Sequence, residues 1–188
     1  MRSHATTWQT VGPFFHIGMG HLDAHALAPP GAPGERVAIE GQVFDGNGEP
    51  VPDAVIEIWQ ANADGEYCCA SRAQERAGPA AFTGFGRIAT DAQGRFHFTT
   101  IRPGPTLGPD GAMQSPHLAV RVMMRGLLKA LVTRLYFPSE TLTGDPILHL
   151  VPEHRRTTLI GTAIAGRDAT LMWNIELQGE RETVFFDC

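Results

Sequence analysis

His117 is the residue best suited to chemistry in this sequence, because an imidazole can bind a transition metal or transfer a proton. It lies in the stretch SPHLAV, residues 115–120, which opens a run of alternating apolar and polar residues typical of a β-strand. The next side chain on the same face of such a strand is that of Ala119, which cannot bind a metal. Three interpretations stay open for His117: a metal ligand, the remnant of a metal site, or a hydrogen-bonded strand residue.

Other potential ligands and nucleophiles form no recognisable site. His16, His21 and His25 are irregularly spaced and form no pattern with carboxylates or cysteines. Cys68 and Cys69 are adjacent, so a bond between them would strain the backbone, and they lack the C-x-x-C spacing of a zinc site. The sequence contains no Ser-His-Asp pattern, no phosphate-binding loop and no internal repeat.

The composition excludes several classes of function. The chain has 188 residues, a formal net charge of −5 and a pI near 5.9, so it lacks the excess of lysine and arginine typical of a nucleic-acid-binding surface. No apolar run of about 18 residues predicts a membrane span, and the first ten residues contain no signal-peptide core. We therefore expect a cytoplasmic protein, and its length fits a single domain over residues 1–188.

The elements that must position these residues are nearly all β-strands. Alternating or apolar segments predict strands over residues 36–44, 54–61, 95–101, 117–124, 130–137 and 170–177. The Gly- and Asp-rich stretch DGNGEPVPD predicts a hairpin turn between the first two strands. Residues 1–35 form an extended arm without periodicity, and residues 152–161 predict at most one short helix. The pattern favours an antiparallel β-sandwich, or a closely related barrel, with long loops over residues 61–85 and 102–116.

Four longer stretches resemble the intradiol ring-cleavage dioxygenases. They are QTVGPFF, IEGQVFDGNGEPVPDAVIEIWQANADGEY, FGRIATDAQGRFHFTTIRPG and TRLYF, in the order that the family shows them. The ending GERETVFFD resembles the alpha subunit of the heteromeric members that cleave protocatechuate. Together these stretches cover nearly the whole chain, so the resemblance implies a β-sandwich with the architecture of that family.

The resemblance implies a catalytic Fe(III) held by two tyrosines and two histidines, but this chain keeps only half of that set. Tyr67 matches the first tyrosine and Thr106 stands at the second, while His117 matches the first histidine and Ala119 stands at the second. Losing a phenolate and an imidazole should collapse the site, so we expect the partner beta subunit to hold Fe(III). Tyr67 and His117 then persist either because they pack well or because they retain some metal affinity.

The resemblance also implies that three residues of this chain border the substrate pocket: Thr10, Gly12 and Arg134. A guanidinium suits the carboxylate of protocatechuate, because it donates planar, charge-assisted hydrogen bonds, and a glycine lets the backbone approach closely. An alternative is that Arg134 pairs with an acid at the subunit interface and that Thr10 only satisfies a turn. Arg87, in FGRIATD, is interpreted as a structural arginine at a strand end.

The resemblance therefore predicts an alpha subunit that is inactive alone. It would shape the pocket and the assembly while the beta subunit, with Fe(III), cleaves protocatechuate with O2 between the hydroxylated carbons to 3-carboxy-cis,cis-muconate. The alternative is a non-enzymatic β-sandwich that binds another protein and shares only ancestry with the dioxygenases. A self-sufficient dioxygenase with relocated ligands is a third hypothesis, which Thr106 and Ala119 disfavour.

Overall fold

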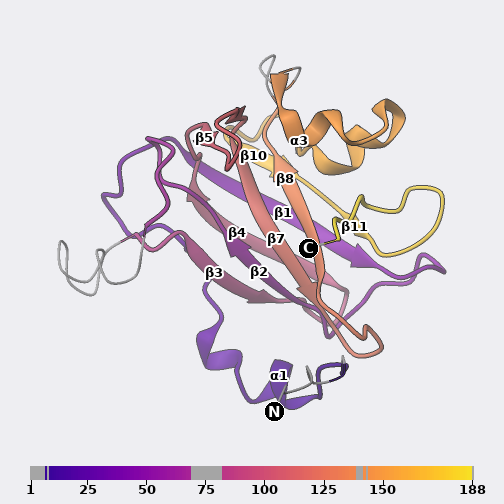
Figure 1. The fold of residues 1–188 in the computed structure, drawn as a ribbon. Helices are drawn as coiled ribbons and strands as arrows, with labels where there is room; N and C mark the ends of the chain where they lie inside the picture. Colours follow the sequence, from indigo (N-terminus) through magenta and orange to yellow (C-terminus); the bar gives the residue numbers. More distant parts are fainter. Residues whose placement is uncertain (1–6, 8, 69–81, 139–141, 143, 188) are drawn as a thin grey trace, which may run out of the picture.

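The computed structural model describes residues 7, 9–68, 82–138, 142 and 144–187, and these build two packed β-sheets (Figure 1). In the larger sheet, β1 pairs antiparallel with β4 on one side and parallel with β10 and β11 on the other, and β9 pairs with β10. Its strands are β1 (Arg36–Phe44), β4 (Arg95–Ile101), β9 (Thr162–Ala163), β10 (Thr170–Met172) and β11 (Ile175–Glu176).

The smaller sheet is antiparallel and has the order β3-β2-β7-β8. Its strands are β2 (Val55–Trp59), β3 (Phe85–Ala89), β7 (His117–Met123) and β8 (Leu131–Tyr136). A separate two-stranded ladder, β5 (Thr106–Leu107) with β6 (Met113–Gln114), lies within the predicted loop 102–116. The predicted loop 61–85 falls partly on residues 69–81, which lie outside the described residues.

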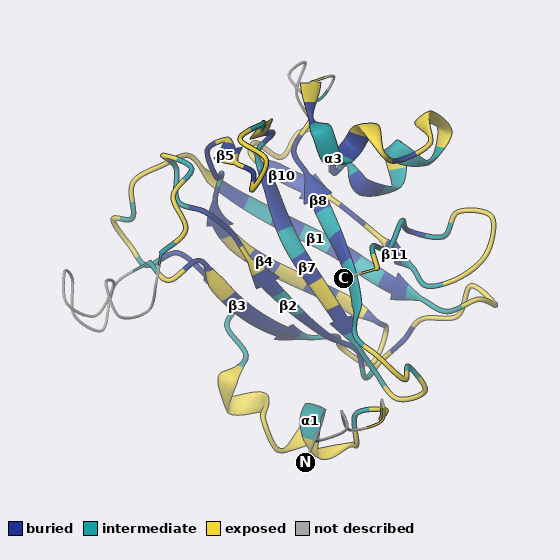
Figure 2. Cartoon of the chain, in the orientation of Figure 1, coloured by how far each residue is buried: buried dark blue, intermediate teal, exposed yellow. Residues whose placement is uncertain are grey.

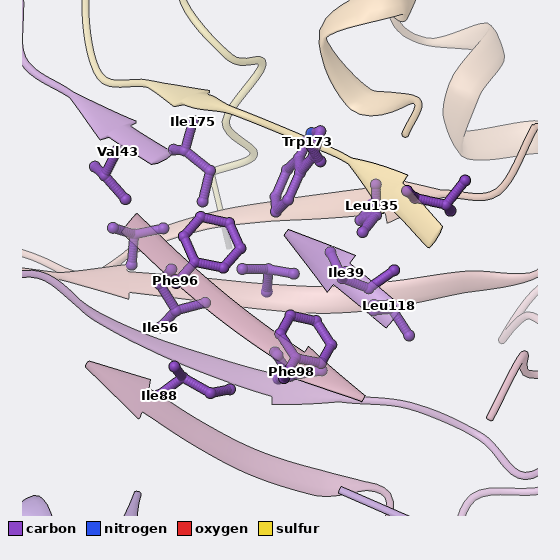
Figure 3. Close-up of a cluster of buried hydrophobic side chains, with 14 of the residues drawn as sticks. Ile39, Val43, Ile56, Ile88, Phe96, Phe98, Leu118, Leu135, Trp173 and Ile175 are labelled. Atoms are coloured by element: carbon purple, nitrogen blue, oxygen red, sulfur yellow. The ribbon is translucent and has the colours of Figure 1, made fainter. Parts of the chain in front are cut away.

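Alternation along the strands places one apolar face of each sheet in a shared core. On β1 every second residue from Val37 to Val43 is buried, and on β4 Phe96 and Phe98 are buried between exposed neighbours (Figure 2). Figure 3 shows these side chains meeting residues of the smaller sheet, such as Ile56. The predicted all-β sandwich is confirmed, and its inner faces leave the opposite faces available for other contacts.

Two pairings differ from the simplest interpretation of the sequence. The turn after β1 forms as predicted, with Val51 N–H donating to the Val43 carbonyl at 3.0 Å, but β2 then joins the other sheet. Residues 170–176 run parallel to β1, not antiparallel. Both differences come from the sandwich itself, because a chain that crosses between layers can bury apolar residues from β1 and β2 in one core.

Short helices lie in two places in Figure 1: some cover the upper end of the sandwich, and others lie below its lower edge. The sequence predicted one helix over 152–161, and a three-ten helix, η4 (Glu153–Leu159), is found there. The described residues also contain α1 (Phe14–Ile17), η1 (Gly20–Leu22) and α3 (Pro146–His149). These have too few turns to show helical periodicity. None of the helices in the described ranges is long and apolar enough to cross a membrane.

One turn is built three times, at Asp45, Asn62 and Asp91. In each, the side-chain Oδ1 accepts hydrogen bonds from the backbone N–H groups two and four residues later. The third following residue is a glycine with a positive φ of 78°, 83° or 70°, a conformation that costs other residues steric strain. The three stretches DGNG, NADG and DAQG therefore specify the same connection, and two of these connections carry the chain from one sheet to the other.

The arm closes the side of the sandwich where β3 and β4 are edge strands. Ala24 N–H donates to the Arg87 carbonyl of β3 at 2.8 Å, and Leu27 N–H donates to the Thr99 carbonyl of β4 at 2.8 Å. Thr99 N–H donates in turn to the His25 carbonyl. Leu27 is buried among the core residues. Residues 24–27 thus occupy hydrogen-bonding groups that an uncovered edge would leave open.

Candidate functional site

His117 lies on the outer face of the smaller sheet, at the start of β7. Its ring is buried and its Nδ1 donates to the Ser115 carbonyl at 2.8 Å, which fixes the neutral tautomer with hydrogen on Nδ1. The ring contacts that of Tyr136, its register partner on β8, with centroids 5.7 Å apart. The prediction that His117 belongs to a strand is confirmed, and its hydrogen bond and ring contact account for its burial.

Arg134 lies on the same face, in register with Ala119. Its Nη1 donates to Gln114 Oε1 at 2.8 Å and makes a longer contact of 3.4 Å to the Tyr136 hydroxyl. The Tyr136 hydroxyl donates to Asp145 Oδ1 at 3.1 Å. In the described part of the chain, the hydrogen bonds of Arg134 come from Nη1 alone, and no carboxylate forms an ion pair with it.

Asp145 anchors this network although it precedes a helix of only four residues. Its carboxylate is fully buried at 0% exposure and accepts hydrogen bonds from the backbone N–H groups of Ser115, Ile147 and Leu148 at 2.7–3.0 Å. It is the N-cap of α3, with Pro146 in the first helical turn. The carboxylate therefore joins α3, the entry to β7 and the end of β8.

Thr106 and Tyr67 complete the positions that the resemblance assigned to iron ligands. Thr106 is buried on β5 and pairs with Gln114 of β6, the residue that accepts from Arg134. Tyr67 is 42% exposed. We refer to Tyr67, Thr106, His117, Ala119 and Arg134 as the ligand-position cluster. The structure brings these five residues together from four segments of the chain: the loop after β2, β5, β7 and β8.

Burial and the Arg134 charge together set the protonation of the cluster. Burial, and after it the positive charge of Arg134, lowers the pKa of His117 to about 4. Burial raises the pKa of Tyr67, and Arg134 and Thr106 oppose that rise. Burial likewise raises the pKa of Tyr136, again opposed by Arg134. At neutral pH the cluster therefore holds a neutral imidazole, the neutral phenol of Tyr67 and one guanidinium cation, and the neighbouring Tyr136 is a neutral phenol as well.

The residues of the cluster do not fit the ferric iron of the resemblance. Thr106 and Ala119 supply neither a phenolate nor an imidazole at two of the four positions, and hard Fe(III) needs anionic oxygen donors. The Arg134 guanidinium is close enough to both remaining donors, Tyr67 and His117, to act on their pKa values. Across the described residues, no three His, Cys, Asp or Glu side chains lie close enough to hold a metal ion.

Thr10 and Gly12 lie apart from the cluster, at the other end of β7. Thr10 Oγ1 accepts a hydrogen bond from Gly126 N–H at 2.9 Å and donates to the Met124 carbonyl at 3.4 Å. Met124 is seven residues beyond His117, or about 20 Å along a strand. Gly12 is exposed, and a Cβ added to it would meet no atom within 4 Å. Within one chain, these two residues therefore do not share a pocket with Arg134.

Arg87 anchors the arm to β3 and is structural as interpreted, although it lies in the middle of β3 (Phe85–Ala89) and not at a strand end. Only 3% of the side chain is exposed, and its Nη1 forms an ion pair with Asp23 at 2.6 Å and a bond to the Met19 carbonyl at 3.2 Å. Its Nη2 donates to the Phe15 carbonyl, and the guanidinium lies 5.0 Å from the Phe15 ring centroid. The position of α1 on the sheet therefore depends on this arginine.

Among the residues that the structure describes, the remaining candidates form no second site. His25 stacks on His97 with ring centroids 4.6 Å apart and makes a 3.0 Å hydrogen bond to its carbonyl. Cys68 is a free thiol, whereas Cys69 and Cys188 lie outside the described residues.

Sequence reasoning missed Gln114, Tyr136 and Asp145. Asp145 followed by Pro146 is an N-cap signal that could have been recognised. Tyr136 lies two residues after Arg134, on the same strand face. Gln114 lies in a stretch without periodicity, and nothing in the sequence alone marks it.

Comparison with known proteins assigns the class that the fold and the ligand positions suggest. A family model described as Dioxygenase matches residues 11–179, and the chain belongs to the intradiol ring-cleavage dioxygenase family, whose members use Fe(III). It is similar to the protocatechuate 3,4-dioxygenase alpha chain of Burkholderia cepacia, at 41% identity over 97% of this chain and 96% of the relative.

Two further similarities bear on the assembly and on the fold. The protocatechuate 3,4-dioxygenase beta chain of Burkholderia cepacia is 38% identical over 68% of this chain and 55% of the relative. An intradiol ring-cleavage dioxygenase from Tetranychus urticae superposes with a TM-score of 0.61 at 17% identity, over 93% of this chain and 94% of that one. The first relates this chain to both subunit types, and the second supports the fold alone.

Proposed function

We propose that this chain is the alpha subunit of a heteromeric protocatechuate 3,4-dioxygenase. The observation that carries the proposal is its similarity to an alpha chain over nearly the full length of both proteins. A beta chain, which is also similar, is the partner that would hold Fe(III). The assembled enzyme would cleave protocatechuate with O2 between the hydroxylated carbons to 3-carboxy-cis,cis-muconate, in the cytoplasm.

The role of this chain would be to shape the pocket and support the assembly. Two of the four ligand positions hold residues that cannot bind iron, so the chemistry has to come from another chain. Full-length similarity to an alpha chain, including the arm and the C-terminal segment, favours this role over a free-standing protein-binding sandwich. We retain that module only as the alternative that the experiment below tests.

Thr10, Gly12 and Arg134 are the residues we propose for the substrate pocket. Among the described residues, Arg134 donates hydrogen bonds from Nη1 only, and a guanidinium can bind a carboxylate through two parallel hydrogen bonds. Gly12 is exposed in the arm, where an approaching chain or ligand would meet backbone only. Because Thr10 and Gly12 lie far from Arg134 in one chain, they would contact the pocket from a different side.

Co-expression with the beta chain tests the proposed function. We expect the two chains to copurify in equal amounts, with about one iron per pair, and to convert protocatechuate with uptake of one O2 per turnover. This chain alone should be inactive. A beta chain that is equally active without this chain, together with no association between the two, would support the protein-binding alternative.

A further inference from the structure

The ligand-position cluster contains a cation of its own. On the outer face of the smaller sheet, β8 places Arg134 directly opposite Ala119, the position that lost its imidazole. Tyr136 lies directly opposite His117, the imidazole that remains. Arg134 therefore lies beside position 119, where the imidazole is missing, and two residues along β8 from the position opposite His117.

Hydrogen bonds fix this guanidinium within the cluster. Gln114 accepts from Nη1 at 2.8 Å, and the Tyr136 hydroxyl lies 3.4 Å from the same nitrogen. Tyr136 is itself held by the buried Asp145 carboxylate at 3.1 Å. Rotation of the guanidinium out of the cluster would leave Gln114 and Tyr136 without these contacts.

Residues on three sides of the site are affected by the same charge. The positive charge of Arg134 adds to burial in lowering the pKa of His117 on β7, and it opposes the rise that burial causes in the pKa of Tyr67, in the loop after β2, and of Tyr136 on β8. A bound metal ion would act on these groups in the same direction, because it also favours phenolate and neutral imidazole. The guanidinium thus supplies part of the electrostatic effect of a metal ion.

We propose that Arg134 closes the former metal position of this chain: its guanidinium takes the place of the metal charge and excludes a metal cation even when ligands are restored. The loss of iron then has two separable causes, the missing donors at positions 106 and 119 and the resident cation at position 134. The proposal concerns the residues of this chain alone and does not depend on the proposed function or on the beta chain.

Restoring a single ligand separates the two causes. Ala119 is half-buried on the outer face of β7, in register with Arg134, so Ala119→His returns an imidazole to the position that lost it. With Tyr67 and His117, it would give three donors of the types that bind transition metals. Like charges repel strongly in a partly buried site, so the intact arginine should still prevent binding.

The test uses the full chain expressed alone with added iron, in three variants. The first variant is Ala119→His alone. The second combines it with Arg134→Met, which removes the charge and retains most of the side-chain volume. The third combines it with Arg121→Met and is the matched control. Arg121 is an exposed arginine on the same face of β7. Circular dichroism and melting establish that each variant is folded. Iron per chain and tyrosinate-to-iron absorption in the visible region report binding, and Co(II) titration gives an affinity independent of oxidation state.

We expect Ala119→His alone and the Arg121→Met control to hold at least tenfold less iron than the Arg134→Met combination. Their Co(II) affinity should be on the order of 100-fold weaker. Ala119→His combined with Arg134→Lys should again exclude the metal ion, because lysine restores the positive charge without the planar guanidinium group. Equal metal binding with and without Arg134 would overturn the proposal, and so would a folded Arg134→Met combination that binds no metal. If the Arg134→Met combination has a low melting temperature, the lysine variant decides the question. Metal binding by the lysine variant would also overturn the proposal.

Discussion

Replacing Asp145 should be one of the most damaging single changes outside the hydrophobic core. The carboxylate is fully buried and accepts hydrogen bonds from three backbone N–H groups and the Tyr136 hydroxyl. Asp145→Ala removes the N-cap of α3, worth about 1 kcal/mol. It also removes the acceptors that Tyr136 and the Ser115 N–H use, at about 1–3 kcal/mol each. Because these bonds share one network and do not add fully, we expect a total loss of about 3–5 kcal/mol.

The assay is urea unfolding of the full chain, with the free energy taken by linear extrapolation. Asp110→Ala is the matched control, because Asp110 is exposed and accepts one backbone hydrogen bond, from Ala112 at 3.1 Å. That control should lose less than about 1 kcal/mol. Asp145→Asn, which retains one oxygen, should fall between the two alanine variants. A loss for Asp145→Ala no larger than that of the control would refute the assignment of Asp145 as the anchor of the cluster.

Four further changes test other parts of the structure. Arg134→Ala in the assembled enzyme should lower kcat/KM for protocatechuate about 10- to 150-fold, because a charge-assisted hydrogen bond is lost. The value for catechol, which has no carboxylate, should fall much less. An equal loss for both substrates would assign Arg134 a structural role only. Gly86→Ala should destabilise the chain by about 1–3 kcal/mol and expose the arm to protease, because the new Cβ would lie 2.4 Å from Leu27 Cγ. Gly12→Ala should leave the melting temperature unchanged and still reduce activity of the complex, and unaltered activity would remove Gly12 from the pocket. Acidification from pH 6.5 to 4 should destabilise the full chain through His117, whose pKa of about 4 in the fold lies below its unfolded value, so that the unfolded chain binds the extra proton. The contribution is about 3 kcal/mol, present above pH 6.5 and lost as the pH falls to 4, and His117→Gln should remove that part of the pH dependence.

The strands of the core could be predicted from the sequence because burial imposes alternation on them. β1 and β4 show it plainly, with apolar residues at every second position and a turn signal after β1. The bounds of β3 were not predicted, although Arg87 was placed at a strand end, because Gly86 and Arg87 suit neither an apolar run nor simple alternation. Their reasons are tertiary: Leu27 of the arm packs against Gly86, and Asp23 pairs with Arg87.

The site was predictable only as far as the resemblance supplied positions. Tyr67, Thr106, His117 and Ala119 could be matched from short motifs, and the structure brings them together. The groups that now hold the cluster could not be found in this way. Gln114 acts through its pairing with Thr106 on a two-residue ladder, a contact that no local pattern predicts.

The fold can lose iron ligands because they lie on the face of the sheet that the core does not use. Leu118 and Val120, which alternate with His117 and Ala119 on β7, face the core and are buried with 0% and 2% exposure. A metal ion held by donors from separate segments also acts as a cross-link, so its loss should loosen those segments. Here the Nη1 bond from Arg134 of β8 to Gln114 of β6 provides a connection of the same kind. Substitution of a cross-linking cation by a hydrogen-bonded arginine explains how the surrounding loops keep their places although half of the ligands are gone.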